Sequence, residues 1–135
     1  MPAPADRTPF SIPVTALAAD IDELGHVNNT VYLRWVQDVA TAHWHGMSRP
    51  GDVDRYIWVV TRHEIDYLRG TLLGETLTLT TWVGTPMGAR FDRYVDIIGA
   101  DGKLRVRAAT IWAVIDRASG RVIRVPPEVA APFLA

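Results

Sequence analysis

The chain has 135 residues, no cysteine, and a formal net charge of −1 from 14 basic and 15 acidic side chains. This length predicts one domain that buries a hydrophobic core large enough to fold without disulfides. The absence of cysteine excludes disulfides, a thiolate nucleophile and a cysteine metal site. The near-neutral charge argues against a nucleic-acid partner and against an anionic membrane surface.

The N-terminal residues 1–7 are expected to be loosely ordered, and residues 8–135 to form the domain. Met1–Pro9 carries no apolar segment of signal-peptide length. No stretch approaches the ~18 uninterrupted apolar residues of a membrane span. A cytoplasmic location without membrane contact is therefore expected.

The first regular element is a strand, followed by a loop. Apolar and polar residues alternate over Phe10–Leu17, which predicts the strand. The segment Ala19–Val27 carries three acidic residues, Gly25 and His26 and is expected to be a loop. Asn28 and Asn29 then stand where a helix N-terminus is capped.

A helix is expected over Asn29–His45, with Gly46 as its stop signal. Val31, Trp35 and Val39 follow one another at intervals of four residues, and a second apolar row lies one step round the helix. This broad apolar surface predicts that the helix is the only long one and that a sheet encloses it.

Strands and tight turns dominate the rest of the chain, and the turn at Asp101-Gly102 is a strong hairpin signal. The expected strands are Tyr56–Leu68, Thr76–Val83, Arg90–Ile98, Leu104–Ile115 and Arg121–Val125. A short helix is expected to begin at Pro126-Pro127-Glu128. Consecutive strands with short turns make an antiparallel meander, so the fold class is α+β.

The chemistry-bearing residues gather where the first loop enters the long helix. Asp22 and His26 precede a helix N-terminus, which presents unpaired N–H groups and a partial positive charge. Such a terminus can stabilise an oxyanion on a carbonyl. A neighbouring carboxylate can attack that carbonyl or activate water. These parts suffice for acyl transfer to water without a metal.

The run Asp22-x-x-Gly25-His26-Val27-Asn28-Asn29-x-x-Tyr32 resembles the signature of hotdog-fold thioesterases of the 4-hydroxybenzoyl-CoA thioesterase class. It is most similar to the branch of bacterial long-chain acyl-CoA and plant acyl-ACP thioesterases. The resemblance implies one long helix wrapped by an antiparallel sheet. It also implies hydrolysis of an acyl-CoA or acyl-pantetheine thioester, no cofactor and no metal. Homodimers or dimers of dimers are implied, with the active site between subunits.

The resemblance also assigns roles to residues. Asp22, rather than Asp20, is implied as the catalytic carboxylate, with His26 as a further catalytic residue. The helix N-terminus is implied to polarise the thioester carbonyl through backbone N–H groups of Asn28, Asn29 and Thr30. The sequence departs from the branch at Leu24, Arg34 and Gln37, where an asparagine and two glutamates are usual.

Three residues are candidate substrate contacts: Tyr32, Arg90 and Arg93. Arg90 and Arg93 on one strand, like Arg105 and Arg107 on the next, are expected to share a face of the sheet. That face would bind CoA phosphates or simply carry solvated charges. His43 and His45 are two residues apart, so they point to different faces of the helix and do not form a metal pair.

Two other functions compete with thioester hydrolysis. One is a hotdog enoyl-CoA hydratase or dehydratase, in which the Asp-to-His spacing is typically wider than from Asp22 to His26. The other is a non-catalytic acyl-CoA-binding module. Asp22 could equally be a helix-capping residue, and Asn28 and Asn29 are preferred cap residues in any protein.

Overall fold

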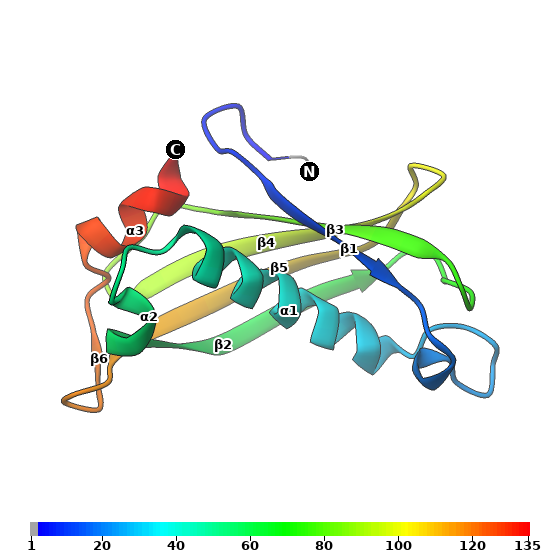
Figure 1. Ribbon diagram of the computed structural model, residues 1–135, viewed down its shortest axis with the longest axis horizontal. Helices are drawn as coiled ribbons and strands as arrows, with labels where there is room; N and C mark the ends of the chain where they lie inside the picture. Colours follow the sequence, from blue (N-terminus) through cyan, green and yellow to red (C-terminus); the bar gives the residue numbers. More distant parts are fainter. Residues whose placement is uncertain (1–2) are drawn as a thin grey trace.

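A computed structural model describes residues 3–135 and contains one long helix against a six-stranded antiparallel sheet (Figure 1). The elements in chain order are β1 (Phe10–Thr15), the 3₁₀ turn η1 (Ala18–Asp20), α1 (Asn29–Met47), α2 (Asp52–Arg55), β2 (Tyr56–Tyr67), β3 (Thr76–Val83), β4 (Arg90–Gly99), β5 (Leu104–Asp116), β6 (Arg121–Ile123) and α3 (Pro127–Leu134). This is the predicted α+β architecture.

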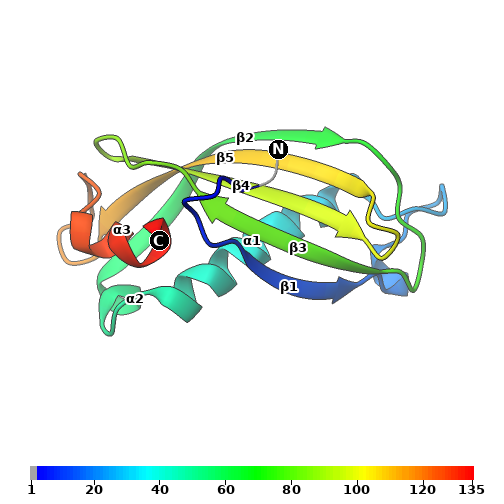
Figure 2. The same cartoon turned by 90° about the horizontal axis from the view of Figure 1, so that it is seen from above.

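The sheet has the strand order β1-β3-β4-β5-β2, with every pair antiparallel. β3, β4 and β5 form a meander as predicted, but β2, which was expected to belong to it, pairs with β5 and not with the next strand in sequence, β3. Gly102 takes a φ of +78° in the β4–β5 turn, where a side chain would be strained. β4 pairs with β5 as far as Ala113, and β6 pairs with β5 from Val114 onward. β1 and β2 are therefore the two edges of the sheet (Figure 2).

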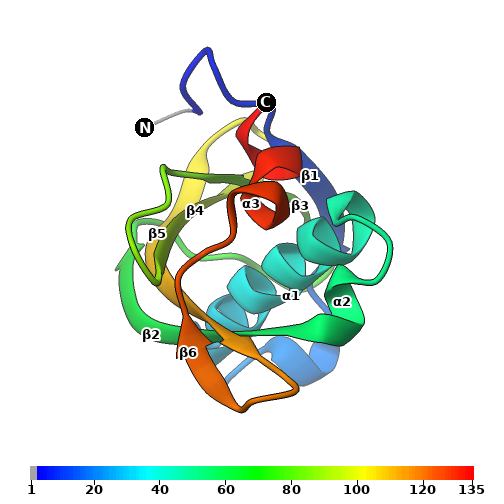
Figure 3. The ribbon, with the colours of Figure 1, turned by 90° about the vertical axis from the view of Figure 1, so that its left-hand side faces the viewer.

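Helix α1 lies in the curve of the sheet, with β1, β3, β4, β5 and β2 arranged around it (Figure 3). Its N-terminus forms because the Asn28 side chain accepts a hydrogen bond from the Thr30 N–H. The apolar residues predicted to face the sheet are all buried: Val31, Tyr32, Trp35, Val36, Val39 and Ala40. Burial of each of the three valines contributes roughly 1.5–3 kcal/mol. The prediction of a single long, enclosed helix is confirmed.

The helix runs two residues further than the sequence predicted. Gly46 does not stop it, because Gly46 stays outside the left-handed region and packs toward Phe10. The chain leaves the helix at Ser48, which takes an extended conformation two residues before Pro50. The short α2, which follows Gly51, was not expected, since a single turn is too short to show helical periodicity.

The N-terminal segment contacts the body of the fold through Arg7. Its Nε donates to the Val83 carbonyl at 3.2 Å and its Nη1 to the Leu134 carbonyl at 3.0 Å. Residues 1–2 of the segment expected to be loosely ordered lie outside the described residues. No helix within residues 3–135 is long and apolar enough to cross a membrane.

Candidate active site at the N-terminus of α1

Asp20 anchors the loop that leads into α1. Its carboxylate accepts hydrogen bonds from the Leu17 backbone N–H at 3.0 Å and from Arg34 at 3.0 Å, and the residue is only 6% exposed. The Leu17 hydrogen bond, followed by Arg34, lowers the pKa of Asp20 despite its burial. Asp20 therefore supports the loop.

Asp22 opens a tight turn that His26 closes. The Asp22 N–H donates to the His26 carbonyl at 2.9 Å, and the Gly25 N–H donates to the Asp22 carbonyl at 3.0 Å. Gly25 completes the turn with a φ of +83°, which favours glycine. One carboxylate oxygen of Asp22, Oδ1, accepts from the Leu24 N–H at 2.9 Å. The other, Oδ2, has no hydrogen-bond partner among residues 3–135 and remains available for chemistry.

The N-terminus of α1 leaves one backbone donor free. The Asn28 N–H donates to the Asp20 carbonyl, the Thr30 N–H to Asn28 Oδ1, and the Val31 N–H to the Asn28 carbonyl. The Asn29 N–H has no acceptor within the described chain, as expected at the first position of a helix. Of the three predicted backbone donors, only Asn29 can therefore point an unengaged N–H at a ligand.

A cleft of about 380 Å³ joins these groups. It brings together five of the predicted site residues: Asp22, His26, Asn28, Asn29 and Tyr32. Thr30 does not line it, since both its N–H and its hydroxyl are bonded to Asn28 Oδ1. The opposite wall was missed by the sequence analysis and comes from the end of β2 and the following loop: Tyr67, Leu68, Arg69 and Gly70. The signal available in the sequence was the run of one aromatic, one apolar and one cationic residue, Tyr67-Leu68-Arg69, at the end of a long predicted strand.

The predicted substrate contact Tyr32 reaches the cleft with its ring, but its hydroxyl is engaged elsewhere. The hydroxyl donates to Thr71 Oγ1 at 2.9 Å, and both residues are almost fully buried. Burial is the main cause that raises the pKa of Tyr32. Arg105 secures the same wall by donating to the Gly70 carbonyl at 2.9 Å and to Glu75 at 2.9 Å. Tyr32 thus holds the Gly70–Thr71 wall in place.

His26 packs on Gly70 across the cleft. A Cβ added at Gly70 would lie 2.7 Å from His26 Cδ2, a distance that real side chains do not reach. The glycine therefore lets the imidazole approach the opposite wall closely. His26 itself is exposed, so its ring is accessible from solvent.

The structure does not bring Arg90 or Arg93 to this cleft, and it corrects their predicted shared face. Residues three apart on a strand point to opposite sides. Arg90 is exposed and pairs with Asp92 at 2.7 Å. Arg93 points to the inner side and contacts His43 on α1. His43 is buried and His45 exposed, which confirms that these histidines lie on different helix faces.

Comparison with known sequences gives a family match over most of the chain. The profile of the thioesterase-like superfamily matches residues 16–133. A chloroplastic acyl-(acyl-carrier-protein) hydrolase of Cuphea viscosissima is 33% identical over 76 residues, which cover 54% of this chain and 18% of that relative. The chain thus spans less than a fifth of the curated relative that it matches.

Solved structures share the fold at low sequence identity. A Lactobacillus plantarum protein proposed to be an oleoyl thioesterase superposes with a TM-score of 0.86 at 20% identity, over 96% of this chain and 52% of that one. A Staphylococcus aureus protein solved with CoA superposes with a TM-score of 0.84 at 16% identity, over 97% of this chain and 85% of that one. A 1,4-dihydroxy-2-naphthoyl-CoA thioesterase from Synechocystis superposes with a TM-score of 0.80 at 17% identity, over 93% of this chain and 96% of that one. These similarities confirm the predicted hotdog fold.

Proposed function

Because the chain belongs to the thioesterase-like superfamily, we propose that it hydrolyses acyl thioesters of CoA or of acyl carrier protein to a free acid and a thiol. One observation carries this proposal. The free Asp22 Oδ2 and the free Asn29 N–H belong to residues that line the same cleft. One supplies a carboxylate and the other a backbone donor, which are the two groups that acyl transfer to water needs.

The thioester carbonyl oxygen would accept from the Asn29 N–H. This donor lies at the positive end of the α1 dipole, so it stabilises the negative charge that develops on that oxygen. Asp22 would then either attack the carbonyl carbon or take a proton from an attacking water. In both cases the carbon–sulfur bond breaks, the thiol leaves with a proton, and one water is consumed.

The other cleft residues would position the substrate. His26 and Arg69 stand at the cleft and are suited to contact the polar pantetheine arm or its carrier. Tyr67 donates weakly to the Asn29 carbonyl, at 3.4 Å, which ties the end of β2 to the first turn of α1. The two walls that enclose a thioester are thereby held together. A cytoplasmic location stays a prediction from the sequence.

A homodimer is part of the proposal. β2 is an edge strand of 12 residues, twice the length of the other edge strand β1. A long edge with unpaired backbone groups is a template for pairing with a second copy. Isologous pairing about a two-fold axis would run the two β2 strands antiparallel and extend the sheet across the dimer. Two such dimers could then assemble further.

A thiol-release assay on a panel of acyl-CoA and acyl carrier protein thioesters tests the proposed activity. We expect turnover of at least one member, with the free acid and thiol formed in equal amounts. Loss of conjugation from an enoyl-CoA without thiol release would favour a hydratase instead. Tight binding of acyl-CoA without any turnover would favour a binding module.

A further inference from the structure

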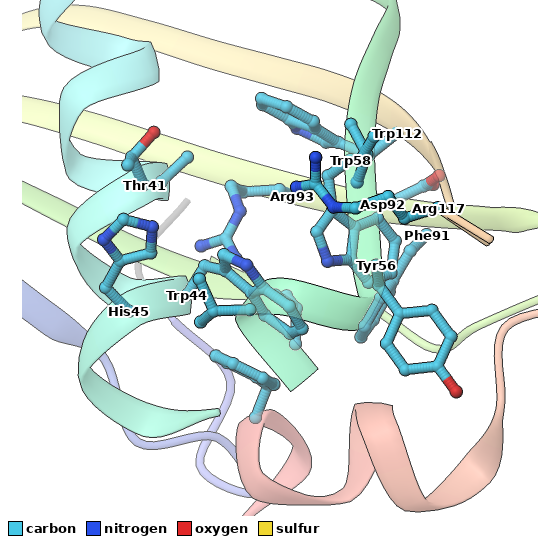
Figure 4. A pocket seen from close by; sticks show the side chains of 15 residues that line it. Thr41, Trp44, His45, Tyr56, Trp58, Phe91, Asp92, Arg93, Trp112 and Arg117 are labelled. Atoms are coloured by element: carbon cyan, nitrogen blue, oxygen red, sulfur yellow. The ribbon is translucent and has the colours of Figure 1, made fainter. Parts of the chain in front are cut away.

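A second cavity lies at the other end of α1, and it shares no lining residue with the Asp22 cleft. It holds about 250 Å³ between the C-terminal half of α1, the start of β2 and the inner faces of β4 and β5. Its walls are largely aromatic: Trp44, Tyr56, Trp58, Phe91, Trp112 and Phe133. Figure 4 shows most of these rings together with Arg93 and Arg117 around one space. A cavity of this size and lining fits one small aromatic group.

Arg93 brings a positive charge into this aromatic cavity. Its Nη1 donates to His43 Nδ1 at 2.9 Å and to Thr81 Oγ1 at 3.0 Å, and both partners are neutral. Among residues 3–135, Arg93 has no ion-pair partner, and its Nε and Nη2 have no acceptor. Those two nitrogens form the fork that binds a carboxylate through two parallel hydrogen bonds. Burial lowers the pKa of Arg93 to about 10, so the guanidinium stays charged at neutral pH.

Trp58 lines the cavity, but its indole N–H does not face it. The Nε1–H is closed off inside the protein and has no hydrogen-bond partner in the described chain. Arg93 is therefore the donor that a ligand in the cavity meets. Asp92 also belongs to the lining, but its side chain lies on the Arg90 side of β4, and Arg90 engages both carboxylate oxygens, at 2.7 and 3.0 Å. The unengaged groups named here are therefore donors.

Aromatic walls and a charged fork together define a ligand class. We propose that this cavity binds a small aromatic carboxylate, with its ring against the aromatic walls and its carboxylate on Arg93. The carboxylate belongs either to a free acid or to the far end of the acyl group of a thioester. The second source rests on the proposed thioesterase function, whereas binding of the free acid does not.

Calorimetric titration of the wild-type protein with three probes tests the binding. The probes are trans-cinnamate, its uncharged amide, and hexanoate. We expect cinnamate to bind at least tenfold more tightly than the amide, which lacks the charge, and than hexanoate, which lacks the ring. Equal affinity for cinnamate and cinnamamide, or no cinnamate binding at millimolar concentration, overturns the proposal.

Two variants locate the binding. Trp58→Phe replaces the indole of the cavity wall by a smaller ring and breaks no internal hydrogen bond, so it should weaken cinnamate threefold to tenfold without loss of thermal stability. Arg93→Met should remove the preference for cinnamate over cinnamamide. Arg90→Gln is the matched control, because Arg90 lies on the same strand but faces outward and pairs with Asp92. Unchanged cinnamate affinity in folded Trp58→Phe and Arg93→Met would refute the assignment.

Inhibition kinetics distinguish the two sources of the carboxylate, which are a free acid and the acyl group of a thioester. If the cavity receives the acyl end of a thioester, cinnamate should raise KM for an aromatic acyl-CoA without lowering kcat. If it receives a free acid at an independent site, cinnamate should change kcat or leave both constants unchanged. Both results support the binding site. If the protein hydrolyses no thioester, the calorimetric result still decides the proposal.

Discussion

Asp20 and Asp22 stand two residues apart, but their surroundings assign them different tasks. Asp20 is buried and bonded to Arg34 and to the Leu17 backbone, whereas Asp22 keeps one oxygen free at the cleft. A carboxylate that performs chemistry must have an unengaged oxygen. The sequence motif pointed to Asp22, and the hydrogen bonds give a physical reason for the choice.

Asp22→Asn should abolish most of the activity while leaving ligand binding intact. The amide keeps the shape of the carboxylate and its contact with the Leu24 N–H, but it has no charge and little basicity. Loss of a general base typically lowers the rate about 10²–10⁴-fold. We therefore expect kcat to fall by at least about 100-fold, with the affinity for a non-hydrolysable CoA thioester analogue nearly unchanged.

The matched control for this variant is Glu23→Gln. Glu23 is the adjacent residue, is exposed and does not line the cleft, so its loss should change kcat less than twofold. Asp20→Asn is not a suitable control, because it would weaken the ion pair between the buried Asp20 carboxylate and Arg34, which holds the loop. An Asp22→Asn protein that is folded and retains a third or more of wild-type kcat would rule out the proposed chemistry.

Gly70→Ala should perturb the cleft without unfolding the protein. The new methyl group would collide with the His26 ring, which is exposed and can rotate into solvent. We expect the melting temperature to change by less than about 3 °C and kcat/KM to fall about tenfold, since small displacements of a site group are costly. His26→Ala should give a loss of similar size. A large loss in Gly70→Ala with none in His26→Ala would show that the imidazole is not involved.

At the scale of elements, most of the fold was predictable from sequence because its signals are local. Each signal determines the conformation of only a few neighbouring residues. Examples are the alternation over Thr76–Val83, the turn at Gly102 and the cap at Asn28. The opposite wall of the cleft could not be predicted, because it depends on the loop after β2 folding back onto α1. The prediction that Arg90 and Arg93 share a face was wrong. Successive side chains of a strand point to opposite faces, so the spacing of three residues alone places these two arginines on opposite faces.

Packing of α1 on the sheet should make stability depend on pH through His43. Burial, with a smaller effect from Arg93, lowers the pKa of His43 from 6.5 to about 4. Between these values the unfolded chain binds a proton that the folded protein does not. Stability is therefore full above about pH 6.5 and falls as the pH drops toward 4, by about 3 kcal/mol if this group acts alone.

Denaturant unfolding of His43→Gln at pH 7 and pH 4.5 measures this contribution. Glutamine does not titrate and can still accept from Arg93, so the variant should lose less stability between the two pH values than the wild type. His45→Gln is the control, because His45 is exposed on the same helix and should leave the pH dependence as it is. An identical pH dependence in wild type and His43→Gln would contradict the expected protonation.

At the scale of the whole molecule, the proposed dimer predicts a mass of twice 15.0 kDa, or a higher even multiple. The long β2 edge supplies the backbone groups for association. Light scattering coupled to size exclusion at micromolar concentration measures this mass. A single species at 15.0 kDa under these conditions would exclude the assembly.

The two ends of β2 border different cavities: Tyr56 and Trp58 line the Arg93 cavity, and Tyr67 lines the Asp22 cleft. In an antiparallel pair, the first end of one strand meets the last end of the other. If the cavity receives the acyl end of a thioester, each chain would then lend its aromatic cavity to its neighbour's Asp22, so that Asp22→Asn and Arg93→Met damage different halves of a shared site. Mixing the two variants and letting the subunits exchange would restore one intact site in each hybrid, or about a quarter of wild-type activity per chain. Two defective chains would thus complement each other.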